Sequence, residues 1–157
     1  MSNSKTLTCF KAYDVRGKLG EELNEEIAYR IGRATAQSLN ANTIVLGFDA
    51  RATSPNLAQS LARGICNAGA DVLNIGLTGT EEMYAAVSEF GACAGIEVTA
   101  SHNPINYNGM KIVKHCSQPL TDQEFSNIKQ LAEQNKPILS KHSGLVIDNR
   151  SAARNTY

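Results

Sequence analysis

The sequence predicts an α/β domain in which helices flank a layered, mixed but largely parallel sheet. Through most of the 157 residues, short apolar segments typical of strands alternate with longer amphipathic segments typical of helices. Residues 94–113 break this alternation, because two apolar runs are joined there by a loop of about ten residues without a helix. We therefore expect the last two strands to be antiparallel.

The first expected element is a short extended segment over residues 9–17 (CFKAYDVRG), which runs into a turn at its Arg-Gly end. Gly17 would let the backbone approach a ligand closely, and Arg16 carries the planar fork that suits phosphate. A surface arginine that only faces solvent is the more ordinary interpretation of this segment alone. Arg16 is thus a candidate phosphate ligand that needs support from other motifs.

The next three elements are a helix, a strand and a second helix. The helix is expected over residues 25–39, because Asn24 suits the N-cap position and apolar residues recur at helical spacing after it. The nearly continuous apolar run over residues 43–48 is typical of a strand buried on both faces. Ser54 as an N-cap and Pro55 in the first turn predict the start of the second helix.

The second half of the chain continues the pattern. A strand over residues 71–75 leads to a helix over residues 80–90, whose first residue is a capping threonine. Apolar runs over residues 94–98 and 110–113 predict the last two strands. The capping-box pattern TDQE starts a final helix over residues 121–133.

These elements predict one domain over residues 8–135, which is a common domain size. Residues 136–157 contain a proline, a glycine, a short apolar run and a polar end. We expect them to be a linker or the start of a next domain.

Composition and charge exclude several classes of protein. The net charge is zero at pH 7, so no surplus of charge favours nucleic acid or an anionic membrane. No apolar run approaches the roughly 18–20 residues of a membrane span. The four cysteines lack C-x-x-C spacing, which argues against zinc and favours small core thiols in a reducing, cytoplasmic compartment.

The most informative stretch is TASHNP at residues 99–104, which follows a strand and precedes a second strand that carries Lys111. One strand thus delivers Ser101 to an exposed loop, and the next returns a lysine toward it, as in the display of a nucleophile or phosphate carrier. Arg51 follows the strand over residues 43–48, at the sheet edge where α/β proteins bind ligands. Arg51 is therefore a second candidate phosphate ligand, unless it caps or pairs locally.

Three interpretations of Ser101 stay open on the residues alone. It is a loop serine in a local turn, an acyl-transfer nucleophile or a phosphate carrier. The adjacent His102 is poorly placed as a base, because neighbouring side chains on an extended loop diverge, and the nucleophile-elbow pattern is absent. Phosphoryl transfer needs cations and oriented donors, which Lys111, Arg16 and the loop amides offer. A Gly-rich P-loop is absent, so a nucleoside triphosphate is not the obvious phosphate source.

Several motifs together resemble one family. TASHNP with NGMK at residues 108–111 resembles the phosphoserine signature of the α-D-phosphohexomutases, and FKAYDVRG at residues 10–17 resembles their opening motif. GTEEMY at residues 79–84 and GIEV at residues 95–98 are similar to the bacterial phosphomannomutase branch. The motifs occur in the expected order, and the resemblance covers about residues 8–135.

The resemblance implies the catalytic roles. Ser101 would be phosphorylated in the resting enzyme and would exchange its phosphoryl group with a hexose phosphate through a hexose 1,6-bisphosphate, which is both intermediate and activator. His102 and Lys111 would be acid/base or charge-stabilising groups, and Arg16 would contact the phosphoserine or the reacting phosphate.

The resemblance also implies binding roles and a cofactor. Arg51, Asn103 and Tyr13 are expected to bind substrate or phosphate. A phosphate oxygen on Ser101 would complete a Mg²⁺ site. The expected substrates are mannose 6-phosphate and mannose 1-phosphate, with phosphoglucomutase, phosphoglucosamine mutase or a non-catalytic phosphate-binding α/β module as alternatives.

Family members have four domains, and their Asp-rich metal loop lies in the second. No Asp-x-Asp-x-Asp pattern occurs in these 157 residues. We therefore expect a fragment of a longer phosphohexomutase, inactive by itself, whose partners are hexose phosphates and the remaining domains of the same chain, with no nucleic acid and no membrane.

Overall fold

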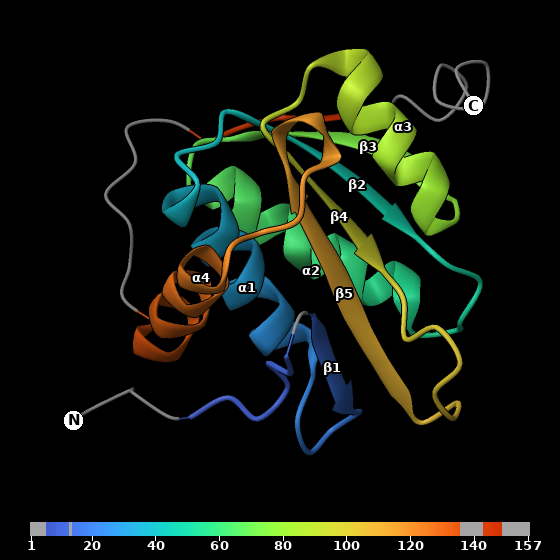
Figure 1. The fold of residues 1–157 in the computed structure, drawn as a ribbon. Helices are drawn as coiled ribbons and strands as arrows, with labels where there is room; N and C mark the ends of the chain where they lie inside the picture. Colours follow the sequence, from blue (N-terminus) through green and yellow to red (C-terminus); the bar gives the residue numbers. More distant parts are fainter. Residues whose placement is uncertain (1–5, 13, 136–142, 149–157) are drawn as a thin grey trace.

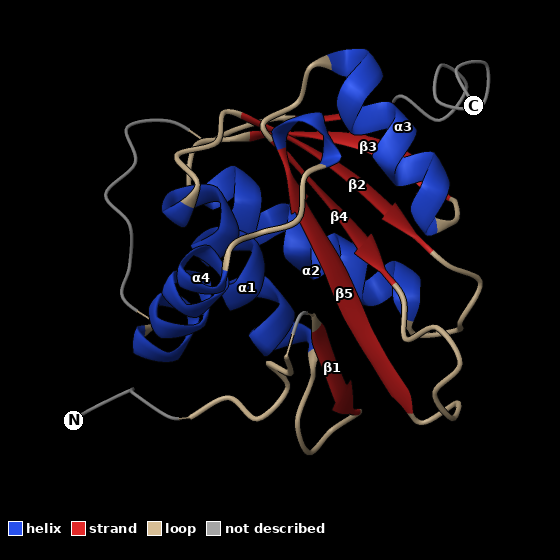
Figure 2. Cartoon of the chain, in the orientation of Figure 1, coloured by secondary structure: helices blue, strands red, loops and turns tan. Residues whose placement is uncertain are grey.

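The computed structural model describes residues 6–12, 14–135 and 143–148, which form a six-stranded sheet flanked by helices (Figure 1, Figure 2). The strands are β1 (Val15–Lys18), β2 (Thr43–Phe48), β3 (Asp71–Leu77), β4 (Ala94–Val98), β5 (Tyr107–Lys114) and β6 (Val146–Asp148). The helices are α1 (Glu25–Ser38), α2 (Ser54–Asn67), α3 (Thr80–Phe90) and α4 (Asp122–Gln134), with a 3-10 turn η1 (His115–Ser117). None of these described helices has the length and apolar character that crossing a membrane requires.

The strand order is β1-β5-β4-β2-β3-β6. β2 pairs in parallel with β3 and β4, and β6 pairs in parallel with β3. β5 is antiparallel to both β4 and β1. The sheet is thus mixed and largely parallel, which confirms the predicted fold class, and the last two strands predicted from the sequence are antiparallel as expected.

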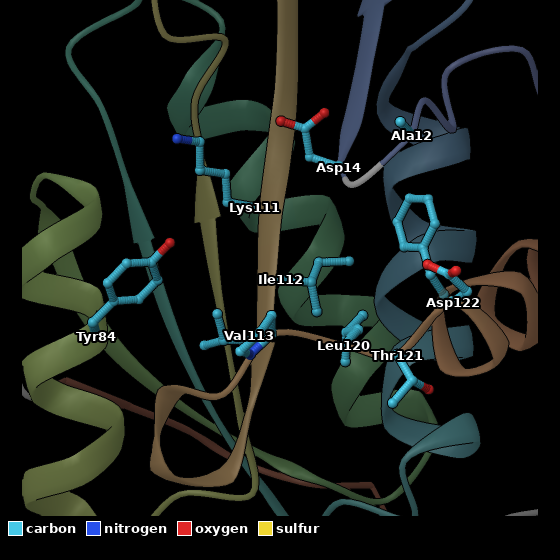
Figure 3. Close-up of a pocket in the computed structure, with 11 residues that line it drawn as sticks. Ala12, Asp14, Tyr84, Lys111, Ile112, Val113, Leu120, Thr121 and Asp122 are labelled. Atoms are coloured by element: carbon cyan, nitrogen blue, oxygen red, sulfur yellow. The ribbon is translucent and has the colours of Figure 1, made fainter.

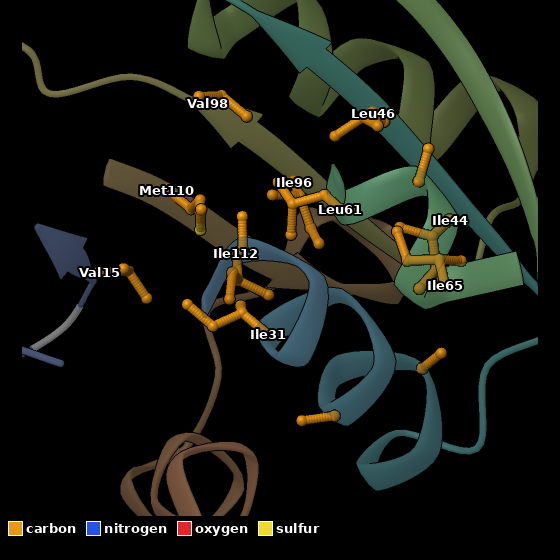
Figure 4. Packing of buried hydrophobic residues seen from close by; sticks show 14 of the residues in the cluster. Val15, Ile31, Ile44, Leu46, Leu61, Ile65, Ile96, Val98, Met110 and Ile112 are labelled. Atoms are coloured by element: carbon orange, nitrogen blue, oxygen red, sulfur yellow. The ribbon is translucent and has the colours of Figure 1, made fainter. Parts of the chain in front are cut away.

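Different helices cover the two faces of the sheet. α1, α2 and α4 pack on one face, and α3 packs on the other with η1 beside it (Figure 1). Ile44 and Leu46 of β2 belong to the core shared with α1 and α2 (Figure 4), whereas Val45 packs with Met83 of α3. Burial on both faces is the reason that β2 is a nearly continuous apolar run in the sequence.

Two glycines let α1 and α2 approach each other closely. A Cβ on Gly64 of α2 would lie 2.1 Å from the carbonyl oxygen of Tyr29 on α1. A Cβ on Gly32 of α1 would lie 2.3 Å from the carbonyl oxygen of Leu61 on α2. The backbones of α1 and α2 are therefore in direct contact, and the two helices form one tightly packed layer on their face of the sheet.

The structure corrects the expected N-terminal segment. β1 begins only at Val15, so Arg16 lies in a strand rather than in a turn. The close approach at Gly17 is to the protein's own chain, because a Cβ there would lie 2.8 Å from Glu22 Cβ and 3.1 Å from Cys9 Cβ. A side chain at this position would therefore clash with the protein's own chain, and the approach of a ligand here stays a prediction.

The prediction that all four cysteines are core thiols is only partly right. Cys9 and Cys66 are buried, but Cys93 is partly buried and Cys116 is exposed, and all four are free. Cys116 is exposed because it lies in the turn after β5, with a left-handed φ of 57°.

Part of the expected linker adds a strand to the sheet. β6 pairs with β3 from Val72↔Val146 to Asn74↔Asp148. Residues 136–142 and 149–157 lie outside the described residues, and the boundary between the domain and a linker stays a prediction.

Candidate active site

The carboxyl ends of β2 and β4 lie side by side, because these strands are parallel neighbours. The N–H of Asp49, just after β2, donates to the carbonyl oxygen of Val98 at the end of β4, with an N···O distance of 3.0 Å. Residues 99–106 connect β4 to β5, and we call them the serine loop (Figure 1). The fold therefore brings Arg51 to the serine loop from 50 residues away.

Ser101 is exposed in the serine loop and has a left-handed backbone, with a φ of 54°. Its N–H donates to Thr99 Oγ1 at 3.1 Å, and the Asn103 N–H donates to the Ala100 carbonyl oxygen at 3.0 Å. The left-handed conformation costs a residue other than glycine roughly 1–2 kcal/mol, so the surrounding contacts must hold it.

The Arg51 side chain donates hydrogen bonds to backbone carbonyl oxygens of the serine loop and of the first residue of β5. Its Nη1 donates to the carbonyl oxygens of Pro104 and Tyr107, at 2.8 and 3.0 Å. Its Nη2 donates to the carbonyl oxygens of Ser101 and Asn103, at 3.1 and 2.5 Å. The side chain thus bonds to backbone 50 to 56 residues away, and it also lies 3.8 Å from its near neighbour Asp49. Its predicted contact with a phosphate stays a prediction.

A buried polar network supports Arg51 and the end of the loop. Asp49 Oδ1 accepts hydrogen bonds from the Arg51 N–H at 3.1 Å and from Ser54 Oγ at 2.6 Å. Asn108 Nδ2, at the start of β5, donates to Ser54 Oγ at 3.0 Å and to Thr53 Oγ1 at 2.9 Å. Ser54 was expected to cap α2, but Thr53 holds that position and Ser54 serves this network instead.

The two other predicted cations lie on one face of the sheet. Arg16 on β1 is paired with Gly109, and Lys111 follows two positions along β5. Because paired residues share a face and side chains alternate along a strand, Arg16 and Lys111 project to the same side. Arg16 pairs with Asp14 at 2.9 Å and stays 35% exposed. Lys111 has no hydrogen-bond or ion-pair partner among the residues that the structure describes.

A pocket of about 280 Å³ opens beside β5 next to Lys111 (Figure 3). Asp14, Tyr84 and Thr121 contribute to its lining from three other parts of the chain. Ser101 and the rest of the serine loop are not among the lining residues, so the pocket does not contain the loop.

Glu97 is a residue that the sequence analysis did not assign to the site. It is fully buried on β4, directly across from Lys111 on β5. Thr78 Oγ1 donates to its Oε1 at 2.9 Å, and burial raises the pKa of the Glu97 carboxyl to about 8. Gly47 leaves room for this carboxyl, since a Cβ there would lie 2.6 Å from Oε1. A charged residue inside an apolar strand run was the signal in the sequence.

The remaining predicted residues lie in or near the serine loop. His102 is exposed and Asn103 is partly buried, both close in sequence to Ser101. Tyr13 lies outside the described residues, so its predicted binding role is not addressed. In the described ranges, no group of three His, Cys, Asp or Glu side chains is arranged to hold a metal ion. The Mg²⁺ site at Ser101 therefore stays a prediction.

Comparisons with known proteins agree with the resemblance. Residues 7–138 match the family model described as Phosphoglucomutase/phosphomannomutase, alpha/beta/alpha domain I. A protein of Escherichia coli named phosphomannomutase is 59% identical over 131 residues, which are 83% of this chain and 29% of that protein. A protein of Klebsiella pneumoniae with the same name is 59% identical over 131 residues, which are 83% of both chains.

A solved structure agrees as well. The crystal structure of a phosphoglucomutase/phosphomannomutase family protein from Burkholderia thailandensis is 32% identical and matches with a TM-score of 0.80, over 94% of this chain and 34% of that one. The chain thus spans 29% of the E. coli relative's length. The family match includes β1, the serine loop and β5, which hold Arg16, Ser101 and Lys111. The chain belongs to the phosphoglucomutase/phosphomannomutase family and carries its α/β/α domain I.

Proposed function

We propose that this chain is the phosphoserine domain of a phosphomannomutase, which interconverts mannose 6-phosphate and mannose 1-phosphate. The observation that supports it best is the exposed Ser101, held in a left-handed conformation at the carboxyl edge of the sheet. Two cations, Arg16 and Lys111, project from the neighbouring strands on one face. That arrangement suits a group that carries and releases a phosphoryl group.

The proposed chemistry is a pair of phosphoryl transfers. In the first, a hydroxyl oxygen of the hexose monophosphate attacks the phosphorus on Ser101, and the bond from phosphorus to Ser101 Oγ breaks. The hydroxyl proton passes to a base, for which Lys111 and His102 are the candidates. In the second, Ser101 Oγ attacks the other phosphorus of the hexose 1,6-bisphosphate, and the bond from that phosphorus to the sugar oxygen breaks. The released sugar oxygen takes back the proton from the base, and the phosphoserine is regenerated.

The protein's own groups stabilise charge in these steps. Arg16 keeps part of its guanidinium exposed beside Asp14 and can donate to phosphate oxygens. Lys111 supplies a positive charge that no partner among the described residues neutralises. A Mg²⁺ ion at the Ser101 phosphate, when bound, would neutralise further charge on the transferring group.

The choice of mannose rests on the relatives, since two proteins that are 59% identical to this chain are named phosphomannomutase. Glucose and glucosamine phosphates are the alternative substrates. The free thiols fit the reducing, cytoplasmic compartment that we propose.

Phosphorylation of Ser101 tests the proposal. The protein is incubated with Mg²⁺ and a hexose 1,6-bisphosphate, and peptide mass spectrometry follows residues 99–106. We expect one phosphoryl group on Ser101, its loss on addition of mannose 6-phosphate, and no phosphorylation of this peptide in Ser101→Ala.

The control is Ser143→Ala, which removes another hydroxyl far along the chain and should leave the phosphorylation unchanged. The experiment is carried out both with residues 1–157 and with these residues joined to the remaining length of the E. coli relative. A folded protein whose Ser101 takes no phosphoryl group in either form would contradict the mutase and favour a phosphate-binding module.

A further inference from the structure

We infer that Arg51 is a positioning residue, which holds the serine loop in the conformation that presents Ser101 and does not itself bind the substrate's phosphate. The inference rests on the proposed function for its catalytic consequence. Its structural part, that Arg51 stabilises the loop through hydrogen bonds, depends only on the observed contacts.

The first argument is that both terminal nitrogens of Arg51 are fully used by the loop. A guanidinium has five N–H donors in a rigid fork. In Arg51, four hydrogen bonds from Nη1 and Nη2 reach carbonyl oxygens of the serine loop and its junction with β5. The remaining N–H, on Nε, faces Asp49 Oδ2 at 3.8 Å. A phosphate could bind the edge formed by Nη1 and Nη2 only by displacing the loop that carries Ser101.

The second argument is that the loop needs a cation beneath it. The carbonyl oxygens of Ser101, Asn103, Pro104 and Tyr107 converge on one point, where their dipoles would repel one another without a positive charge. Ser101 also has a left-handed φ of 54°, which tertiary contacts must stabilise. The Arg51 fork satisfies both requirements with one side chain.

The third argument is that Arg51 is itself anchored to rigid elements. Asp49 accepts from the Arg51 N–H and from the buried Ser54, and Ser54 accepts from the buried Asn108. The Asp49 N–H also donates to the carbonyl oxygen of Val98, one residue before the serine loop. Both ends of the loop and the arginine are thus tied to the same junction after β2.

Arg16 provides the contrast. Its side chain is 35% exposed and makes one ion pair, with Asp14, whereas the Arg51 side chain is 16% exposed and surrounded by carbonyl oxygens. Of the two arginines that the sequence nominated, Arg16 is the one with donors free for a phosphate, and Arg51 acts through the loop.

Amide hydrogen exchange over residues 99–107 tests directly whether Arg51 stabilises the serine loop. We compare the unchanged protein with Arg51→Ala, Arg51→Lys and the matched control Arg63→Ala. Arg63 is an exposed arginine of α2 whose side chain bonds, within the described part of the chain, only to Ser60 Oγ on its own helix. Because Arg51→Ala removes four hydrogen bonds to this segment, we expect exchange in the loop to rise about tenfold or more in Arg51→Ala and not in Arg63→Ala.

Arg51→Lys keeps the charge but loses the fork, so we expect the same loss of protection with the fold retained. Added methylguanidinium should restore protection to Arg51→Ala, and methylammonium should not. Unchanged exchange in both Arg51 variants would overturn the inference, as would full protection in Arg51→Lys.

Kinetics of the full-length enzyme test the catalytic consequence. A misplaced Ser101 should lower kcat about 100-fold in Arg51→Ala while KM for mannose 1-phosphate changes less than about threefold. A raised KM with kcat unchanged would make Arg51 a phosphate ligand and overturn the inference. If Ser101 of the unchanged protein takes no phosphoryl group, the proposed function fails, and the exchange experiment still decides what Arg51 does.

Discussion

Glu97 places a carboxyl group where its ionised form is costly. The side chain is fully buried over Gly47 of β2, and its Oε2 has no partner among the described residues. Burial raises the pKa of Glu97 to about 8 from an ordinary 4.5, although the Thr78 hydrogen bond opposes the shift, and the nearby carboxylates of Asp49 and Glu82 add to it. Glu97 is therefore largely protonated at neutral pH in the folded protein.

This residue predicts a pH dependence of stability. Between pH 4.5 and about 8, the folded protein holds a proton on Glu97 that the unfolded chain releases. Raising the pH through this window should therefore lower the free energy of unfolding, by up to about 1.4 kcal/mol per pH unit. Glu97→Gln removes the titration, so this component of the slope should vanish.

Urea unfolding at intervals from pH 5 to pH 8 measures the slope in both proteins. Glu89→Gln is a suitable control, because that carboxylate is exposed near the end of α3 and is not among the groups that shift the pKa of Glu97. Equal slopes for the unchanged protein and Glu97→Gln would contradict the prediction.

At the scale of single residues, the sequence identified candidate site residues but could not assign the role of each one. Ser101 and Lys111 were found because their motif is contiguous or nearly so. The partners of Arg51 lie 50 to 56 residues away, so local pattern could not distinguish a phosphate ligand from a loop clamp. In the sequence, Glu97 stood out only as a charged residue in an apolar run. The free-energy cost of ionising its carboxyl depends on burial, which only the fold creates.

The secondary-structure elements were predicted best where local signals are strong. β2 and β4 have the predicted bounds, since continuous apolar runs end at polar or small residues. β5 extends from Tyr107 to Lys114, beyond the predicted apolar run, because pairing with β1 and β4 adds residues at its ends. β1 and β6 depend on pairing with distant strands. β1 was predicted only as the end of an extended segment over residues 9–17, and β6 was not predicted as a strand.

The contact between α1 and α2 gives a prediction at this scale. Gly64→Ala would push a methyl group against the Tyr29 carbonyl oxygen, 2.1 Å from its ideal position, and against the Arg33 nitrogen at 2.8 Å. We expect a loss of about 1–3 kcal/mol in the free energy of unfolding, because backbone atoms cannot move aside cheaply.

The measurement is thermal and urea unfolding of Gly64→Ala beside Gly79→Ala. Gly79 has a negative φ of −95°, and a Cβ there would lie no nearer than 4.0 Å to a neighbouring atom, so Gly79→Ala avoids the steric clash and should cost less than Gly64→Ala. Equal stability of the two variants would mean that α1 and α2 separate without cost.

At the scale of the whole molecule, the parallel neighbours β2 and β4 decide where the site lies. Their carboxyl ends meet at one edge, and the antiparallel β5 returns along β4 from that edge. Ser101, Arg51 and Lys111 are thereby gathered from three segments of the chain.

The whole-molecule prediction concerns activity of the chain by itself. It spans 29% of the E. coli relative, and the resemblance places the Asp-rich metal loop and the sugar-recognition loop in other domains. We expect steady-state mutase turnover by residues 1–157 to be at least about 100-fold below that of the full-length E. coli relative, because substrate positioning and metal chemistry are both incomplete.

The assay follows mannose 6-phosphate formation from mannose 1-phosphate with Mg²⁺ and hexose 1,6-bisphosphate in both proteins. Turnover by residues 1–157 equal to that of the full-length relative would show that this domain needs no other.

The sequence by itself determined the α/β class, the order of the main helices and strands, the family and the identity of the serine loop. These features depend on periodicity, capping residues and contiguous motifs, which are properties of neighbouring residues. Only the tertiary structure decided that Arg51 grips the serine loop, that Arg16 and Lys111 share a face, and that Glu97 is buried opposite Lys111. Those facts arise from strand order and register, which join residues far apart in the chain and fix the burial and hydrogen bonds of each side chain.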